Sequence, residues 1–338
     1  MKAWTLVRHG STDRAFELRE HADPVPGEGQ VLIRCEGFGL NYADTMAVKG
    51  LYREAPTVPS VIGYEVVGRV EAVGAGVSEA LMGKRVAALT RFGGYAQLAV
   101  TDHRACAIIP EDLPLGEATA LVTQGCTAWY AARILCPLRK GERVLVHSAA
   151  GGVGHLLVQL AVQSGCEVFA IAGGREKGEF VRRLGAAHII DRHAGDYAQR
   201  ITSILGTHHL DVTFNAVGGN SFRKDLSLLG SGGRLVLFGG AERGGLGALG
   251  TLRFVWRMGL VLPIFLMIKS RSLLGINMLR IGDDQPELLA ECLHGTIAAH
   301  ADGTLRPHVH GVFPHEQLPA AIEALASGST IGKVALRW

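Results

Sequence analysis

Short apolar runs separated by glycine-rich turns fill the first third of the chain. The runs cover residues 30–36, 61–73, 84–89 and 95–100, and glycines at positions 63, 68, 74, 76, 83, 93 and 94 interrupt them. Short apolar runs between turn residues are typical of β-strands. The pattern therefore predicts a compact, barrel-like β domain over residues 1–123.

From residue 124 the pattern changes to alternating strands and helices. Strands are expected at 143–147, 167–172, 188–190, 210–215 and 234–238, with helices at 153–163 and 176–184. Such alternation is typical of an α/β fold with a parallel, doubly wound sheet. A helix at 286–299 and a strand at 332–336 are expected to return to the first domain. The predicted domains are therefore 1–123 with 278–338, and 124–277.

One strongly apolar segment, FVWRMGLVLPIFLMI at 254–268, contains Arg257 and Pro263. It is shorter than the roughly 20 apolar residues that a membrane-spanning helix needs. Two interpretations stay open. The segment is either a helix that covers a substrate cleft or a subunit contact, or a peripheral contact with a membrane surface.

Composition excludes several classes of protein. Hydrophobic residues make up 48% of the 338 residues and charged residues 19%, so the chain can bury a substantial core. The net charge of +3, without a block of Lys and Arg, argues against nucleic acid as a partner. The six cysteines form no C-x-x-C pair, and the N-terminus lacks the apolar region of a signal peptide. We therefore expect a reducing, cytoplasmic location.

Small residues fill the predicted turn between strand 143–147 and helix 153–163. The segment AAGGVG at 149–154 is a G-x-G-x-x-G fingerprint with alanine in place of the first glycine. Gly151 allows the backbone to approach a pyrophosphate, and Gly154 allows the helix to pack closely on the strand. The N-terminus of the helix then favours phosphate. The turn therefore predicts dinucleotide contacts from Ala150, Gly151, Gly152 and Val153.

The residues after strand 167–172 decide which dinucleotide is expected. NAD-binding folds place Asp or Glu at that strand end, where it accepts hydrogen bonds from the ribose 2′-hydroxyl. This strand ends in Gly173 and Gly174, followed by Arg175 and Lys177. Arginine can pair with a 2′-phosphate through two hydrogen bonds. We therefore predict NADPH, held in part by Gly174, Arg175 and Lys177; the alternative is that both cations are merely solvated at a helix start.

Further segments add a resemblance to these motifs. They are GLNYAD at 39–44, GLY at 50–52, GYEVVG at 63–68, VAALTRFGGY at 86–95, NAVGG at 215–219, GGRLVLFG at 232–239, SRS at 270–272 and IGKV at 331–334. In this order and spacing the chain resembles the medium-chain dehydrogenase/reductase superfamily, and within it the quinone oxidoreductase group and its VAT-1-like branch. The resemblance implies a GroES-like catalytic domain, a Rossmann cofactor domain with the active site in the cleft between them, and a homodimer that pairs edge strands at 273–276.

The same resemblance bears on zinc. It places Asn41, Tyr64 and Thr123 at the positions where zinc alcohol dehydrogenases carry their catalytic zinc ligands, and none of these residue types is a usual zinc ligand. The four-cysteine structural lobe is also missing, because residues 85–94 contain no cysteine. We therefore predict an oxidoreductase without zinc. Hydride addition to quinones or α,β-unsaturated carbonyls suits such a site, because the product anion is delocalised.

The resemblance also assigns candidate site residues. Tyr52 matches a tyrosine proposed to donate a proton or hydrogen bond in related enoyl reductases, although packing at the cleft wall is the alternative. Asn41 is expected to contact the ligand, and Asp44 to fix local geometry. On the cofactor side, Thr123 and Thr127 are expected near the nicotinamide and Arg192 near the 2′-phosphate. Strand ends add further cofactor contacts from Asn215, Val217, Phe238, Gly239, Gly240 and Asn277.

Two alternative functions remain. An enoyl reductase for longer acyl chains would use the apolar segment 254–268 as part of a tunnel. An NADPH-binding protein that contacts membranes or lipids with little turnover would use the same segment at a lipid surface. Cofactor binding does not separate these functions, since it does not prove turnover.

Overall fold

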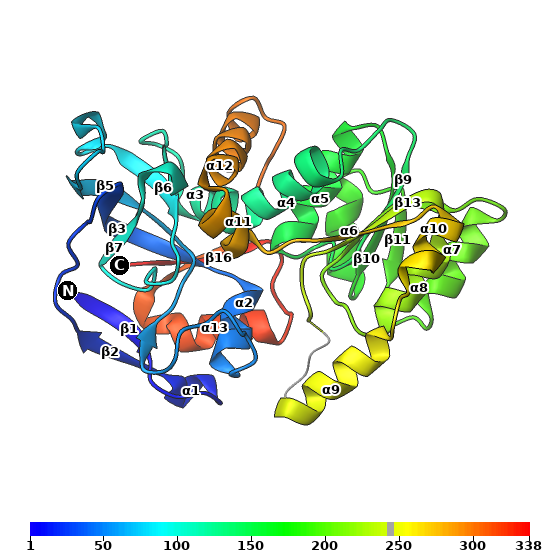
Figure 1. The fold of residues 1–338 in the computed structure, drawn as a ribbon, viewed down its shortest axis with the longest axis horizontal. Helices are drawn as coiled ribbons and strands as arrows, with labels where there is room; N and C mark the ends of the chain where they lie inside the picture. The colour runs from blue at the N-terminus through cyan, green and yellow to red at the C-terminus, as the bar shows by residue number, and fades with distance from the viewer. Residues whose placement is uncertain (242–246) are drawn as a thin grey trace. The chain divides into compact units, whose positions relative to one another are not determined.

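A computed structural model describes residues 1–241 and 247–338 (Figure 1). The chain divides into two units. The first, the β-rich unit, comprises Met1–Cys126 and Met278–Trp338. The second, the parallel-sheet unit, comprises Thr127–Asn277.

The β-rich unit is built on a seven-stranded and a three-stranded sheet. The larger sheet has the order β15-β16-β3-β5-β6-β8, with β7 also paired to β3, and only β15 and β16 are parallel neighbours. The smaller sheet has the order β2-β1-β4. The strands are β1 (Lys2–Leu6), β2 (Phe16–Glu20), β3 (Gln30–Leu40), β4 (Ser60–Val61), β5 (Glu65–Val73), β6 (Arg85–Leu89), β7 (Leu98–Asp102), β8 (Cys106–Ile108), β15 (Val309–Pro314) and β16 (Lys333–Arg337).

Short helices complete this unit. They are α1 (Thr12–Ala15), α2 (Tyr42–Val48), α3 (Leu115–Ala120), α11 (Met278–Asp284), α12 (Pro286–Ala301) and α13 (Leu318–Ala326), and a helical turn at Leu121–Gly125 leads into α4 (Cys126–Trp129). The core packs the inner face of the large sheet, with Phe38 and Tyr95 among its largest members, against Ile322 of α13. The C-terminal residues therefore complete the same core as the N-terminal strands.

The apolar run at 61–73 does not form the single strand that its pattern suggests. It is split into β4 and β5 at Gly63, whose φ is +104°. A Cβ at this position would lie 2.5 Å from the ring of Tyr95. The backbone therefore turns where only glycine avoids both strain and a clash with the core.

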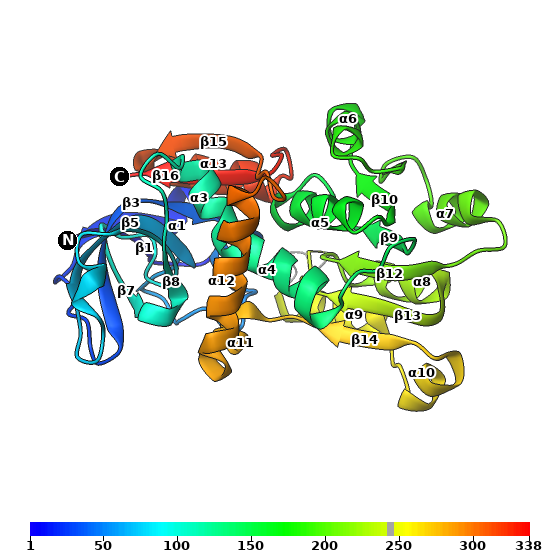
Figure 2. The same cartoon turned by 90° about the horizontal axis from the view of Figure 1, so that it is seen from above.

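The parallel-sheet unit confirms the predicted doubly wound architecture. Its six strands have the order β11-β10-β9-β12-β13-β14, and every neighbouring pair is parallel (Figure 2). They are β9 (Arg143–Val146), β10 (Glu167–Ala172), β11 (His188–Asp191), β12 (Leu210–Asn215), β13 (Leu229–Leu237) and β14 (Ser272–Gly275). The order reverses between β9 and β12. In such sheets, ligands bind at the carboxyl ends of the strands beside this reversal.

The connecting helices of this unit are α5 (Gly152–Gln163), α6 (Arg175–Arg183), α7 (Tyr197–Leu205), α8 (Asn220–Leu228), α9 (Gly247–Met258) and α10 (Pro263–Lys269). A second helical turn covers Tyr130–Leu135. The core between strands and helices contains Leu145, Phe169, Ile190, Phe222 and Leu235. These apolar residues hold the strand ends that carry the candidate cofactor residues.

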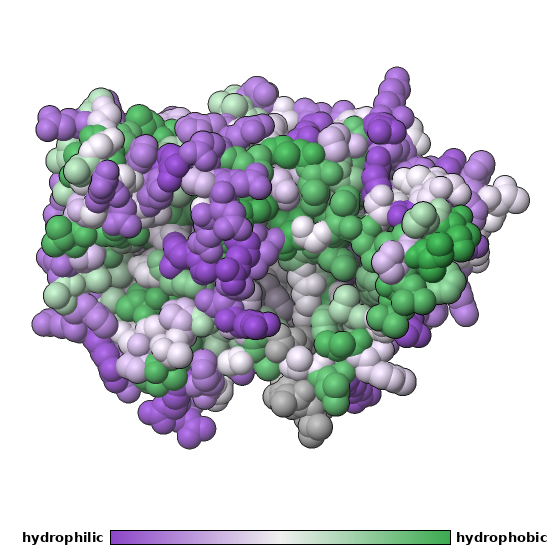
Figure 3. All heavy atoms as spheres, viewed as in Figure 1, coloured by the Kyte–Doolittle hydropathy of each residue, from purple (hydrophilic) through white to green (hydrophobic). Residues whose placement is uncertain are grey.

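The apolar segment 254–268 forms parts of two helices with a break between them. Helix α9 ends at Met258, and α10 begins at Pro263, which suits the first turn of a helix. Many of its large side chains are exposed, including Trp256 (78%), Leu260 (84%) and Met267 (73%). Figure 3 shows hydrophobic surface over α10 and part of α9. Met258 and Val261 pack against the core of the unit, whereas the exposed side chains lie outside it.

Candidate active site and cofactor-binding site

The turn after β9 forms a cradle suited to a pyrophosphate. A Cβ at Gly151 would lie 3.1 Å from the carbonyl oxygen of Ser148, and a Cβ at Gly154 would clash with that same carbonyl. Helix α5 therefore approaches the turn as closely as the fingerprint implies. No side chain caps the N-terminus of α5. Its first N–H groups, at Gly152 and Val153, can therefore bind phosphate oxygens.

Cationic side chains gather beside the end of β10. A Cβ at Gly173 would lie 2.6 Å from Arg192 Nε and 3.1 Å from His193 Nε2, so both side chains lie against this glycine. Burial, with Arg192 nearby, lowers the pKa of Lys177. The predicted cations Lys177 and Arg192 are thus brought together, and His193, which the sequence interpretation missed, joins them. In the sequence, the only hint of this role for His193 is its position next to Arg192.

Arg175 is placed less favourably for this role. Its side chain is 92% exposed, and its Nε donates to Glu179 Oε1 at 2.6 Å. The carboxylate of Asp191, at the end of β11, accepts hydrogen bonds from the backbone N–H groups of Gly174 and His193, and these bonds lower its pKa. No carboxylate follows β10 directly, as the sequence indicated.

The remaining predicted cofactor residues of this unit lie at the ends of β12, β13 and β14. The N–H of Phe238 donates to the carbonyl oxygen of Asn215 at 3.1 Å. A Cβ at Gly239 would lie 2.6 Å from the carbonyl oxygen of Ala216, so the loops after β12 and β13 are in contact. Val217 and Gly240 belong to these loops, and Asn277 follows β14 by two residues. Thr127, in α4, is 8% exposed.

In the β-rich unit, Asn41 begins α2 and its side chain faces the interior. Its Nδ2 donates to Glu65 Oε1 at 3.0 Å, and its Oδ1 accepts from Lys333 Nζ at 3.4 Å. Its backbone N–H donates to Asp44 Oδ2 at 2.7 Å. Both atoms of the amide are therefore engaged inside the domain. In this conformation Asn41 organises its neighbours, and its expected contact with a ligand stays a prediction.

Beneath Asn41 lies an ion pair that the sequence interpretation missed. Glu65 and Lys333 are both completely buried and in direct contact. Lys333 Nζ also donates to the carbonyl oxygen of Leu40 at 3.1 Å, and Glu65 Oε2 accepts from the N–H of Thr123 at 2.7 Å. The pair thereby joins β16, β5, the start of α2 and the turn at Thr123. The sequence contains one hint of this ion pair, because each of the apolar motifs GYEVVG and IGKV includes a charged residue.

Tyr52 and Asp44 lie in surroundings that disfavour their charged forms. Burial raises the pKa of Tyr52 to about 12, so its phenol keeps its proton at neutral pH. Its ring packs edge-on against Tyr64, with centroids 6.0 Å apart. Burial also raises the pKa of Asp44 to about 7. Asp44 is completely buried and bonded to the backbone of Asn41, which agrees with a role in local geometry.

Comparison with known proteins places this arrangement in a family. The profile "Alcohol dehydrogenase GroES-like domain" matches residues 27–132, and the profile "Zinc-binding dehydrogenase" matches residues 152–293. The human synaptic vesicle membrane protein VAT-1 homolog is 32% identical over 344 residues, covering 99% of this chain and 86% of that protein. The chain belongs to the medium-chain dehydrogenase/reductase superfamily, in its quinone oxidoreductase and VAT-1-like group.

Other members of the superfamily include enzymes. The 2-haloacrylate reductase of a Burkholderia species is 30% identical over 318 residues, covering 92% of this chain and 91% of that protein. The solved structure of Escherichia coli quinone oxidoreductase complexed with NADPH has a TM-score of 0.87 at 26% identity, covering all of both chains. The CurK enoyl reductase has a TM-score of 0.85 at 26% identity, covering 99% of this chain and 98% of that one.

These matches confirm the predicted fold class. The β-rich unit is a GroES-like domain and the parallel-sheet unit is a Rossmann-like domain of an oxidoreductase superfamily. Within the described residues, no group of three or more His, Cys, Asp or Glu side chains could hold a metal ion.

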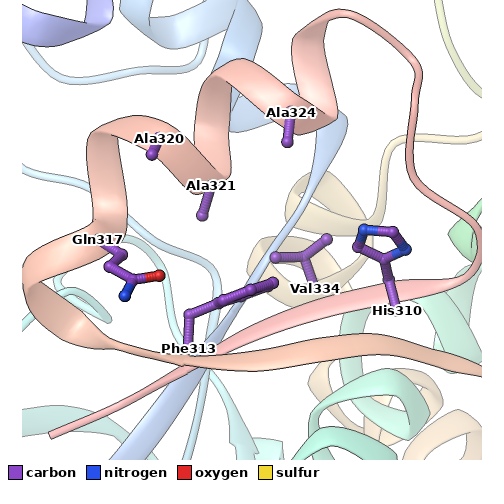
Figure 4. A pocket seen from close by; sticks show the side chains of 7 residues that line it. All are labelled: His310, Phe313, Gln317, Ala320, Ala321, Ala324 and Val334. Atoms are coloured by element: carbon purple, nitrogen blue, oxygen red, sulfur yellow. The ribbon is translucent and has the colours of Figure 1, made fainter.

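An apolar hollow in the GroES-like domain is separate from all of these candidate residues. It measures about 340 Å³ and lies between α13 and strands β15 and β16 (Figure 4). Its lining consists of His310, Phe313, Gln317, Ala320, Ala321, Ala324 and Val334. None of the predicted catalytic or cofactor residues lines it.

Proposed function

We propose that the protein is an NADPH-dependent, zinc-independent reductase of quinones or α,β-unsaturated carbonyls. The observation that carries the proposal is the glycine cradle after β9 together with Arg192, which lies beside Gly173, and Lys177, which lies near Arg192. The cradle fits a pyrophosphate, and the cations fit a 2′-phosphate. The NADPH complex of the Escherichia coli quinone oxidoreductase supports the same cofactor here.

The residues of the chain suit a reduction that needs no metal. When bound, NADPH supplies a hydride to an electron-poor carbon. The protonated phenol of Tyr52 can then donate a hydrogen bond, or its proton, to the oxygen on which negative charge develops. Asn41, which the sequence resemblance aligns with a zinc-ligand position of the zinc enzymes, is held by Glu65 and Lys333. This buried network supports a site organised by hydrogen bonds.

The test is NADPH oxidation by the purified protein with a benzoquinone, a naphthoquinone, a short enone and a long enoyl thioester. We expect turnover with at least one quinone or short enone. Tyr52→Phe should lower kcat by about 10²- to 10⁴-fold if the phenol is the proton donor, with little change in NADPH affinity. Preference for the long thioester would favour the second candidate, an acyl-chain enoyl reductase, which the CurK likeness supports. No turnover with any acceptor, despite NADPH binding, would refute the proposal.

We also propose that the exposed helices α9 and α10 make a peripheral membrane contact. The stretch Gly250–Lys269 has a mean hydropathy of 1.6, and no residue of its most apolar 18-residue window is buried, so by length and composition it could cross a membrane. A single crossing is nevertheless incompatible with the fold. Strands β13 and β14 flank the stretch and pair in parallel, with Leu237 opposite Gly275, and one crossing would separate them. The stretch can therefore lie on a membrane surface but not span it.

Charge specifies the surface that this stretch would prefer. Between residues 250 and 269 it carries Arg253, Arg257 and Lys269 and no acidic residue. Cationic side chains beside apolar ones favour anionic lipid. A membrane- or lipid-interacting protein with little turnover would use the same contact, as would an active reductase.

Flotation with vesicles tests this contact. Wild-type protein should float with vesicles of phosphatidylcholine mixed with phosphatidylserine. Trp256→Glu with Met267→Glu should reduce the bound fraction by about ten-fold or more, since two large apolar contacts are lost. Val25→Glu is the matched control, because Val25 is 85% exposed and lies in the GroES-like domain. Equal binding of all three proteins, or none by the wild type, would contradict the contact.

Two further expectations remain proposals. The edge strand β14 pairs only with β13 within the described residues, so a second copy could add to it and form a homodimer. Sedimentation velocity tests this, and a monomer at every concentration would refute it. A cytoplasmic location also remains our proposal, and fractionation of cells that express the protein tests it.

A further inference from the structure

A buried carboxylate in the Rossmann-like domain contacts three side chains from three other places in the fold. Asp225, on α8, is completely buried. Its Oδ1 lies 3.0 Å from His147 Nε2 and accepts a hydrogen bond from Tyr197 Oη at 2.8 Å. Its Oδ2 accepts from Asn215 Nδ2 at 2.5 Å. His147 follows β9, Tyr197 begins α7 and Asn215 ends β12, so Asp225 connects the strand ends on both sides of the switch point.

The side chain of Asn215 is bonded on every side. Its Oδ1 accepts hydrogen bonds from the backbone N–H groups of Val217 at 2.7 Å and Gly218 at 2.9 Å. Its Nδ2 donates to Ser221 Oγ at 2.9 Å as well as to Asp225. The amide therefore folds the loop at 215–219 around itself. The side chain of Asn215 thus shapes this loop, and the expected contact of Asn215 with the cofactor stays a prediction.

Asp225 determines which way the amide of Asn215 points. A carboxylate can only accept hydrogen bonds, whereas an amide donates from nitrogen and accepts at oxygen. The nitrogen of Asn215 must therefore face Asp225, which leaves the oxygen to face the N–H groups of the loop. A neutral amide at position 225 would replace the charged acceptor with a weaker one, so only the loop N–H groups and Ser221 would still favour this orientation of Asn215.

We propose that Asp225 is a positioning residue for the nicotinamide half of the cofactor. The inference rests on the proposed binding of NADPH. In doubly wound sheets the two halves of a dinucleotide bind on opposite sides of the switch point. The glycine cradle and the cations lie at β9, β10 and β11, while Asn215 and Val217 lie at β12. A changed conformation of the loop after β12 should therefore weaken contacts with the nicotinamide half of the cofactor only.

Calorimetric titration of Asp225→Asn with two ligands tests this. NADPH contains both halves, whereas adenosine 2′,5′-bisphosphate contains only the half that reaches the cradle and the cations. We expect NADPH to bind at least about ten-fold more weakly, because hydrogen bonds to a charged group are lost, while the bisphosphate stays within about two-fold of wild type. Tyr197→Phe is the matched control. It removes hydrogen bonds to Asp225 and to the carbonyl oxygen of Ser221 but leaves every hydrogen bond of the Asn215 side chain in place, so both ligands should bind as to wild type.

A second variant exchanges the two partners, Asn215→Asp with Asp225→Asn. In this variant the carboxylate at position 215 accepts hydrogen bonds from the loop N–H groups. The amide nitrogen at position 225 donates across to position 215. NADPH affinity should return to within about three-fold of wild type, a coupling expected of residues in direct contact. Equal weakening of both ligands in Asp225→Asn, unchanged NADPH affinity there, or an exchanged pair no better than Asp225→Asn would overturn the inference. Failure of the wild type to bind NADPH would instead refute the proposed function.

Discussion

Replacing Lys333 with methionine is expected to destabilise the protein by about 3–5 kcal/mol. The ammonium group of Lys333 is completely buried and contacts Glu65, which is buried as well. Methionine fills a similar volume but leaves the Glu65 carboxylate without its counter-charge. Breaking a buried ion pair from one side costs this much because the remaining charge is uncompensated. Urea denaturation at fixed pH measures the change in the free energy of unfolding.

The double variant Glu65→Gln with Lys333→Met separates charge from packing. Glutamine keeps an oxygen that can accept from the N–H of Thr123, which bonds Glu65 at 2.7 Å. Because no unpaired charge remains, the double variant should be more stable than Lys333→Met alone. If the losses of stability caused by the two single substitutions simply add in the double variant, the pair does not organise this region. A loss of stability below about 1 kcal/mol for Lys333→Met would show the same.

Replacing Arg192 with glutamate is expected to weaken NADPH binding by about 100-fold and to leave NADH binding nearly unchanged. The guanidinium of Arg192 lies against Gly173 at the end of β10. A glutamate there would remove a charged hydrogen bond to the 2′-phosphate and add a repelling charge. Together these effects amount to roughly 3 kcal/mol, which is about 100-fold in affinity. Fluorescence titration with each dinucleotide measures the ratio of the dissociation constants for NADPH and NADH.

Arg183→Glu serves as the control for this change in charge. Arg183 is exposed in the last turn of α6 and lies in the same domain. Its reversal should alter NADPH affinity by no more than about two-fold, since exposed charges at a distance are screened by salt. A parallel loss of NADPH and NADH affinity in Arg192→Glu would place Arg192 away from the 2′-phosphate.

The sequence predicted the parts of the structure that depend on local patterns. Alternating strands and helices after residue 124 gave the parallel sheet, which the structure and its relatives confirm. Gly154 was assigned to a close helix–strand approach, and the clash of a Cβ added there with the carbonyl oxygen of Ser148 agrees with that interpretation. Such features need only neighbouring residues, so periodicity and composition reveal them.

Contacts between distant residues could not be predicted in the same way. Lys333 follows Glu65 by 268 positions, and Asp225 follows His147 by 78. No local pattern shows that a charged residue in an apolar strand faces a partner from another strand. For the same reason the sequence did not show that buried partners engage the amides of Asn41 and Asn215, and the ligand contacts expected of these residues stay predictions. Side-chain direction depends on tertiary packing, which the one-dimensional pattern does not contain.

The most direct test of the account is transfer of deuterium from NADPH labelled at nicotinamide C4, after the purified protein has been treated with a metal chelator. The acceptor is an α,β-unsaturated ketone, and the product is analysed by NMR. We expect deuterium at the β-carbon of the product, because the hydride adds to the electron-poor carbon and no metal takes part. Product that forms only before chelation, or product without deuterium, would contradict it.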